Sequence, residues 1–135
     1  MNNDMNKVRQ ARGKFGEEYT ARQLEQKGWR IVARNYRKRC GELDIVAIDN
    51  DNELVAVEVK TRKFGSMTYG ADAVTWSKKR KIALTLLEYA AENGLEASIM
   101  RFDIAELTIT TEEHPRVLEM NYYKDAFDGT GLKLY

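Results

Sequence analysis

The sequence predicts a single-domain α/β protein with a mixed β-sheet flanked by helices, and three observations lead to this class. The chain has 135 residues, enough for one domain with one main core. Apolar runs of strand length alternate with two helical stretches in the order α-β-β-β-α-β. No repeat, low-complexity segment or linker divides the chain. We therefore expect a disordered tail at residues 1–8, a domain over 9–123 and a C-terminal tail at 124–135.

The first predicted helix covers residues 9–27, a stretch without proline that Gly28 ends. One side of it carries an apolar stripe: Val8, Ala11, Phe15 and Tyr19. The other side carries smaller residues: Gly13, Thr20, Ala21 and Leu24. Glu17 points with the smaller residues, which permit close approach to a sheet and would deliver its carboxylate there. Periodicity alone leaves a solvent-exposed Glu17 equally open.

Three strands are predicted next, at residues 29–36, 41–47 and 54–60, because these runs are short, apolar and rich in strand-forming residues. A polar turn at 49–52 separates the second run from the third. The glycine-containing stretch 62–72 is predicted to be a loop.

A second helix is predicted over residues 73–93, ended by an Asn-Gly pair. Its apolar face, which suits the covering of a sheet, comprises Trp76, Ala83, Leu86, Leu87 and Ala90. Strands are expected at 97–110 and at 117–123, with the only proline in the turn between them.

Charged residues stand at one end of the second and third predicted strands, where a buried strand should not tolerate them. Side chains alternate faces along a strand, so Glu42 shares a face with Asp44, and Glu58 shares one with Lys60. If the turn makes an antiparallel hairpin, Asp44 and Glu58 come close together. Unpaired carboxylates on buried strands are costly, so the arrangement makes most sense with a cation bound.

The chemistry that these residues permit is metal-dependent phosphate chemistry. Mg²⁺ and Mn²⁺ prefer oxygen ligands, which Asp44 and Glu58 supply. Lys60 would orient the attacking water or stabilise charge that develops on the phosphate. An isolated Glu-x-Lys on a strand is commonly a plain ion pair. An acid in one apolar strand, a short turn and a Glu-x-Lys ending the next strand together favour a functional site.

The two strand motifs, Gly41-Glu42-Leu43-Asp44 and Val57-Glu58-Val59-Lys60-Thr61-Arg62, resemble the PD-(D/E)XK nuclease signature in the form seen in archaeal Holliday-junction resolvases. Most of the chain resembles the YraN-like family of small bacterial proteins. The further motifs that carry this resemblance are Gly13-x-x-Gly16-Glu17, Arg34-Asn35-Tyr36, Phe64-Gly65, Ala73-Val74 with Lys78, Arg101-Phe102-Asp103 and Ala126-Phe127.

This resemblance implies a restriction-endonuclease-like core. It also implies metal-binding roles for Asp44 and Glu58, a catalytic role for Lys60 and a supporting role for Glu17. The backbone carbonyl of Val59 often completes the metal shell in such sites. The chain departs from the pattern in that Leu43 stands where the signature has proline.

Several assignments stay open from the sequence. Glu42 is an additional acid, which either binds a second ion or pairs with Arg37 or Arg39. A lysine from the second helix often joins such sites, and the helical pattern does not separate Lys78 from Lys79. Asp103 is either another acid of the site or a partner for Arg101, and the structural role is favoured. Tyr36 and Tyr69 lie near basic residues and could stack on bases, whereas Trp76 is expected in the core.

The basic residues are unevenly distributed. Residues 1–81 contain 18 Lys and Arg against 11 Asp and Glu, whereas residues 82–135 contain 4 against 10. Such asymmetry favours a polyanionic partner, although each cluster taken alone is more often a solvated face. The residues expected to bind nucleic acid are Arg34, Arg37, Lys38, Arg39, Arg62, Lys78 and Lys79.

Taken together, these features predict a Mg²⁺- or Mn²⁺-dependent endonuclease that acts on DNA, at branched or flapped structures. The alternative is a non-catalytic nucleic-acid-binding or repair-accessory protein that keeps the nuclease fold. DNA is not distinguished from RNA, nor one metal ion from two. A homodimer follows by analogy with junction resolvases. The lone Cys40 and the absence of a long apolar segment predict a cytoplasmic protein without a membrane partner.

Overall fold

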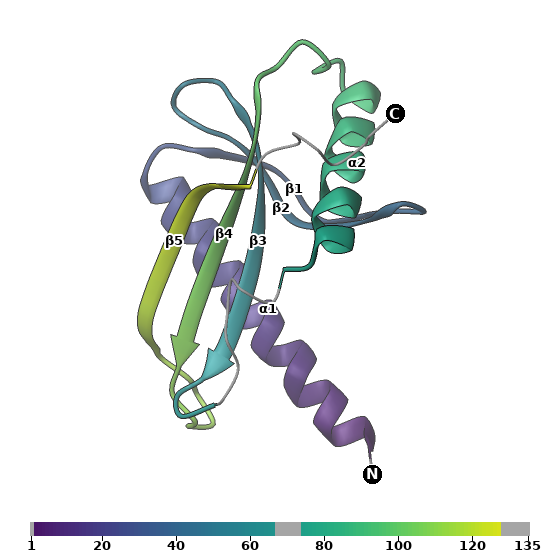
Figure 1. The fold of residues 1–135 in the computed structure, drawn as a ribbon. Helices are drawn as coiled ribbons and strands as arrows, with labels where there is room; N and C mark the ends of the chain where they lie inside the picture. Colours follow the sequence, from purple (N-terminus) through teal and green to yellow (C-terminus); the bar gives the residue numbers. More distant parts are fainter. Residues whose placement is uncertain (1, 67–73, 128–135) are drawn as a thin grey trace.

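A computed structural model describes residues 2–66 and 74–127 (Figure 1). Its elements in chain order are α1 (Asn2–Gln26), β1 (Arg30–Lys38), β2 (Gly41–Ile48), β3 (Leu54–Lys63), α2 (Trp76–Glu92), β4 (Met100–Ile109) and β5 (Val117–Phe127). The predicted class is confirmed: over the described residues the chain forms a single domain with one mixed sheet and two helices, consistent with a restriction-endonuclease-like core.

The sheet follows the chain order β1-β2-β3-β4-β5. Neighbouring strands are antiparallel except for β3 and β4, which run parallel from Leu54 beside Met100 to Lys63 beside Ile109. Two parallel neighbours need a crossover connection, and α2 lies in it. The predicted hairpin of β2 and β3 is confirmed, with Ile45 opposite Val57.

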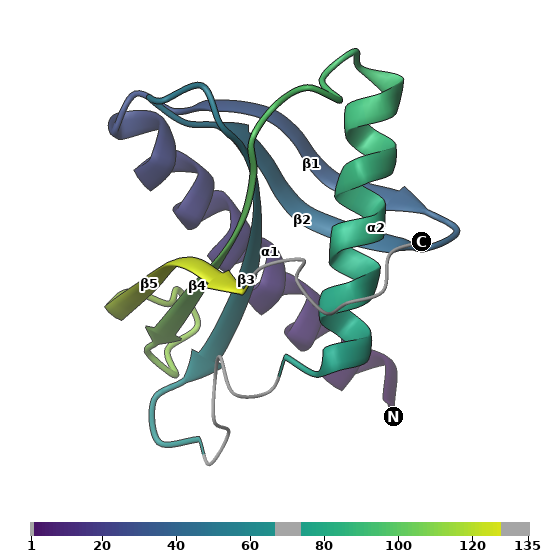
Figure 2. The same ribbon diagram turned by 45° about the horizontal axis from the view of Figure 1, so that its top comes forward.

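Each face of the sheet has its own core, one under each helix (Figure 2). Along β3, Leu54 and Ala56 pack on the α2 side, whereas Val55 and Val57 pack on the α1 side. A strand covered on both faces is apolar at every position, which is why this run lacks the polar alternation of a surface strand. By the same alternation Glu58 lies on the α2 side.

The small-residue face of α1 lies directly against β3. A Cβ atom at Gly16 would lie 1.8 Å from Oγ1 of Thr61, so only glycine fits there. Thr20, Ala21 and Leu24 continue this face and are buried. The predicted close approach of the first helix to the sheet is therefore confirmed, and it holds Glu17 beside the strands.

Two predicted boundaries and one predicted core residue are corrected. α1 begins at Asn2, so residues 2–8 are helical rather than a tail, because nothing in this polar stretch breaks a helix. These first turns of α1 project away from the sheet (Figure 1). β5 continues to Phe127, into the predicted C-terminal tail, because it stays paired with β4 up to Phe102. Trp76 is 55% exposed rather than in the core, because it stands at the first turn of α2.

Neither α1 nor α2, the helices of the described residues, is long and apolar enough to cross a lipid bilayer.

Candidate active site

Strands β2 and β3 stop pairing where the predicted acidic residues begin. Their backbone register runs from Ile48 beside Leu54 to Ile45 beside Val57. Beyond that point β2 stays with β1, up to Gly41 beside Lys38, and β3 stays with β4. The Asp44 side chain takes up one of the hydrogen bonds that the parted strand no longer makes, since its Oδ2 accepts from the Val59 amide at 2.8 Å.

This fork brings Asp44 and Glu58 together, as the hairpin predicts. The next pair in the register after Ile45 and Val57 would be Asp44 and Glu58. Burial, then the charge of Asp44, raises the pKa of Glu58 to about 7. Burial likewise raises the pKa of Asp44, against the opposing hydrogen bond from Val59. The two carboxylates therefore form a close pair of like charges, in which Glu58 is buried and Asp44 is half-buried.

Two lysines lie beside this pair. Lys60 is half-buried and follows Glu58 on the same side of β3. Lys78 reaches across from the first turn of α2, and its Nζ lies 3.1 Å from Oε1 of Glu58. Burial and then the neighbouring Lys78 lower the pKa of the Lys60 ammonium.

The capping of α2 places Lys78 rather than Lys79 at the site. Thr75 is the N-cap residue, and its Oγ1 accepts a hydrogen bond from the Lys78 amide at 3.1 Å. The Lys79 side chain turns instead toward β5, with its Nζ 5.6 Å from the centre of the Phe127 ring. The structure thus resolves an assignment that the sequence left open.

Glu17 lies on the wall of an adjoining pocket of about 580 Å³. The other lining residues come from α1, β1 and β2: Gln10, Gly13, Lys14, Glu18, Arg34, Asn35, Arg37, Glu42 and Asp44. Burial, followed by the charge of Asp44, raises the pKa of Glu17. Glu17 therefore does not point freely into solvent, and it lies near enough to Asp44 to interact with it.

Asn35 is a residue of this pocket that the sequence analysis did not single out for function. Its backbone has a left-handed φ of 51° within β1, and its side chain hydrogen-bonds Glu17. Asparagine tolerates this conformation better than most residues. The available signal was an asparagine inside an otherwise strand-forming run, since asparagine is depleted in strands.

Glu42 adopts the simpler of its two predicted roles. Its Oε2 lies 3.1 Å from Nε of Arg37, and both side chains are largely exposed. Glu42 still lines the pocket that contains Glu17 and Asp44.

The residues expected to bind nucleic acid are mostly paired with acids. Lys38 lies 3.0 Å from Glu92, which also accepts from the Tyr36 hydroxyl. Arg62 lies 2.5 Å from the buried Glu106. Lys78 and Arg37 are also paired, as described above. Arg34 lines the pocket beside Glu17, and Arg39 is exposed in the turn after β1.

A second acidic group lies at the other end of the β2–β3 hairpin. Asp49, Asp51 and Glu53 offer oxygens within 4.8 Å of one another and could hold a metal ion; within residues 2–66 and 74–127 they are the one group of three that does so. The sequence analysis missed this group, although the turn Asp-Asn-Asp-Asn was its signal.

A guanidinium already compensates that group. Arg101 Nη1 lies 2.6 Å from Oδ2 of Asp49 and 3.0 Å from Oε2 of Glu53. Although burial opposes it, hydrogen bonds from Glu53 N–H and from Arg101 hold the pKa of Asp49 below its usual range. Arg101 also pairs with Asp103 at 3.0 Å, which confirms the pairing predicted for that acid. By contrast, the pKa values of Asp44 and Glu58 are raised.

Two residues quoted from the sequence, Tyr69 and Ala73, lie outside the described residues. The role of the Val59 carbonyl stays a prediction.

Comparison with known proteins places these residues in a wider group. A family model described as "Uncharacterised protein family UPF0102" matches residues 16–107, which include every acid and lysine of the candidate site. A UPF0102 protein of Rhodococcus jostii (strain RHA1) is 41% identical over 119 residues, covering 87% of this chain and 96% of that protein. UPF0102 proteins of Pelotomaculum thermopropionicum and Chlorobaculum tepidum are 37% identical over 120 residues and 41% identical over 117. These alignments cover 89% and 85% of this chain, and 98% and 90% of the two relatives.

Proposed function

The chain belongs to the uncharacterised protein family UPF0102, the YraN-like family that its motifs resemble, and we propose that it is a divalent-metal-dependent endonuclease that cleaves DNA phosphodiester bonds. The observation that carries the proposal is the fork between β2 and β3. There Asp44 and Glu58 form a close acidic pair beside Lys60 and Lys78. Branched or flapped DNA is the proposed substrate, acted on in the cytoplasm. A homodimer is proposed by analogy with junction resolvases, which must cut two strands.

The donor set suits Mg²⁺ or Mn²⁺. Asp44 and Glu58 supply hard carboxylate oxygens, and the Val59 carbonyl would complete the protein's share of the ligands. Burial raises the pKa values of both acids, and the charge of Asp44 adds to the rise at Glu58, which means that the ionised forms are destabilised without a cation. When bound, the ion would neutralise phosphate charge and lower the pKa of a bound water.

The chain's own residues have separate tasks in this proposal. The Lys60 Nζ donates hydrogen bonds to the phosphate oxygens on which charge develops. Its lowered pKa also allows Nζ to lose and regain a proton more readily than an exposed lysine would. Glu17 and Asn35 line the adjoining pocket and orient groups that enter it. Arg34 and Arg39 would contact backbone phosphates, which positions the DNA without reading its sequence.

Cleavage of branched DNA in the presence of Mn²⁺ tests the proposal. We expect the wild type to cut, and D44N, E58Q and K60M each to lower the rate at least a hundredfold. The matched control is D51N, which changes an acid of the other cluster and leaves Asp44 and Glu58 untouched. D51N should cut like the wild type. Loss of cutting in D51N with retention in D44N would move the metal site to the Asp49 group and refute the assignment.

The non-catalytic alternative rests on one contact. Lys78 supplies a positive charge to Glu58 without any metal, as a site that has lost its ion would need. That alternative predicts that the wild type binds branched DNA, cuts none of several branched and flapped substrates with Mg²⁺ or Mn²⁺, and gains no thermal stability from either ion.

A further inference from the structure

The N-terminal half of α1 has more basic than acidic residues. Lys7, Arg9, Arg12 and Lys14 fall within about two helical turns, and no acid occurs between Asp4 and Glu17. Like charges three residues apart on a helix, such as Arg9 and Arg12, repel each other. The first turns of this helix project away from the sheet rather than covering core (Figure 1). Its charge is therefore not explained by folding.

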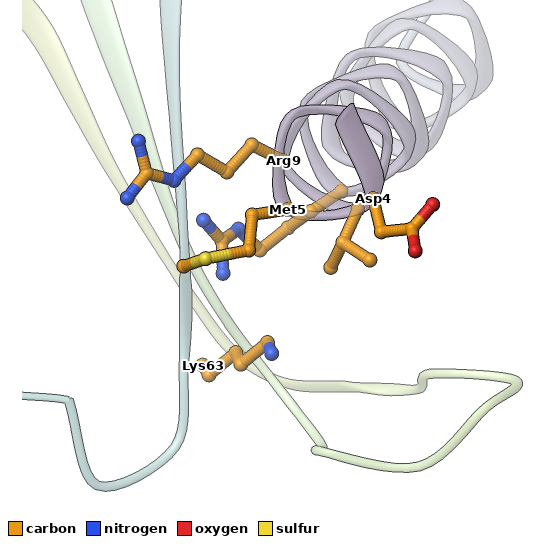
Figure 3. A pocket seen from close by; sticks show the side chains of 6 residues that line it. Asp4, Met5, Arg9 and Lys63 are labelled. Atoms are coloured by element: carbon orange, nitrogen blue, oxygen red, sulfur yellow. The ribbon is translucent and has the colours of Figure 1, made fainter. Parts of the chain in front are cut away.

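Three of the basic side chains in this region surround one open pocket. Arg9 and Arg12 from α1 and Lys63 from the end of β3 line a space of about 440 Å³ together with Asp4, Met5 and Val8. Figure 3 shows the Arg9 and Lys63 side chains on the strand side of the helix, with the Asp4 carboxylate directed away from both. The pocket therefore presents positive charge.

These cations differ from the ones that the sequence analysis selected. Arg37, Lys38, Arg62 and Lys78 each lie within 3.1 Å of a carboxylate oxygen. By contrast, no acid among the described residues forms a salt bridge with the three cations around the pocket. Three cations without a salt bridge in the described part of the chain therefore lie together around this pocket, two on α1 and one at the end of β3.

We propose that Arg9, Arg12 and Lys63 form a binding site for backbone phosphates of DNA, which holds one arm of the substrate next to the cleavage site. The inference rests on the proposed function, because it gives the DNA its second point of contact. Arg9 precedes Glu17 by eight residues, about 12 Å along the helix axis. That rise corresponds to about three to four nucleotides of a duplex strand. One piece of DNA would therefore reach both places, with phosphate contacts independent of sequence.

The salt dependence of binding tests this site separately from catalysis. The dissociation constant for a forked DNA is measured in EDTA, where no metal-dependent cutting occurs, between 50 and 200 mM salt. Each phosphate contact contributes about −0.9 to the slope of log K against log salt. In R9A/R12A the magnitude of this slope should be smaller by about 1.8. The factor by which the affinity falls between 50 and 200 mM salt should therefore be about twelve times smaller than for the wild type. K63A should lower it by about 0.9.

Two further variants keep the test decisive. R9K/R12K preserves the charge and should keep the wild-type slope, whereas R22A removes an exposed arginine elsewhere on α1 and should change nothing. Circular dichroism of R9A/R12A checks that the helix remains. A wild-type slope in R9A/R12A, or an equal reduction in R22A, would overturn the phosphate site and leave the nuclease proposal standing. A reduced slope in R9A/R12A and K63A alone, with no cutting by any variant, would support the site and refute the nuclease.

Discussion

Glu58 is a buried acid whose ionised form is destabilised by its surroundings. It is only 7% exposed, it faces Asp44, and Lys78 offsets its charge only in part. A folded-state pKa of about 7, above the ordinary 4.5, means that the folded protein binds a proton more tightly than the unfolded chain. The stability of the metal-free protein should therefore fall as pH rises from 4.5 through 7.

The variant E58Q isolates this effect. At pH 5 the wild-type carboxyl is largely protonated and neutral, so the two proteins should have similar free energies of unfolding. At pH 8 the wild type has an ionised buried acid, and E58Q should be the more stable by roughly 2 to 3 kcal/mol. Urea unfolding in EDTA at both pH values measures the difference, with the exposed Glu119→Gln as control. A difference between E58Q and wild type that is the same at pH 5 and pH 8 would contradict the assigned pKa.

Arg101 is the opposite case, a buried charge whose partners match it. Its guanidinium contacts Asp49, Glu53 and Asp103 and lies over the Trp29 ring. R101M should leave two buried carboxylates uncompensated and lower the free energy of unfolding by about 3 to 5 kcal/mol. E53Q removes only the partner at the margin of the cluster and should cost about 1 kcal/mol or less. Equal losses in urea unfolding would show that Arg101 is not the centre of the group.

At the scale of single residues, the acids of the candidate site could be predicted, but the pairing of Arg101 with Asp49 could not. Asp44 and Glu58 stand out because carboxylates interrupt apolar strands, and that signal lies within a few residues of sequence. The bond between Arg101 and Asp49 joins residues 52 apart. It depends on the parallel pairing of β3 with β4, which no local pattern specifies.

Among the elements, α1 approaches the sheet closely at Gly16 but has open space at Gly13. Alanine substitutions at these two glycines therefore distinguish the effect of packing from that of helix propensity. G16A would place a Cβ atom 1.8 Å from Oγ1 of Thr61 and force the helix away from β3. We expect a loss of about 1 to 3 kcal/mol in the free energy of unfolding. Because Glu17 moves with this part of the helix, any metal-dependent cleavage should also fall.

G13A is the matched substitution, one turn away. A Cβ atom there meets nothing within 4 Å, so alanine should stabilise the helix by up to about 1 kcal/mol. Urea unfolding of both variants gives the comparison. A destabilised G13A together with an unaffected G16A would mean that α1 does not lie on β3 as described.

The same helix shows why element boundaries are harder to predict than element types. Its central part has a clear small-residue face, which predicts both the helix and its contact with the sheet. The first turns contact little of the core and are mostly polar and exposed, so their sequence does not mark where the helix begins. The helix continues through them because each added residue gains a backbone hydrogen bond and no residue breaks it.

Over the whole molecule, the candidate site depends on elements that are distant in sequence and meet only in the sheet. β2 contributes Asp44, β3 contributes Glu58 and Lys60, and α2 contributes Lys78. The strand pattern could predict the first three because the hairpin is local. Lys78 could not be separated from Lys79, because the choice depends on how the crossover helix is capped and where it lies on the sheet.

That long-range contact yields a prediction about the molecule as a whole. Lys78 lowers the pKa of Glu58, so K78M should raise it above about 7. If the ionised acid is needed to hold a divalent ion, the rising limb of the cleavage–pH profile should move upward by about one pH unit or more. Cutting should recover at pH 9, where Glu58 is ionised in both proteins.

K78R should keep the wild-type profile, because it preserves the charge. K79M should also keep it, because Lys79 faces Phe127 instead of the site. An unchanged profile in K78M, or a shift to lower pH, would show that α2 does not control the charge of the strand that it covers.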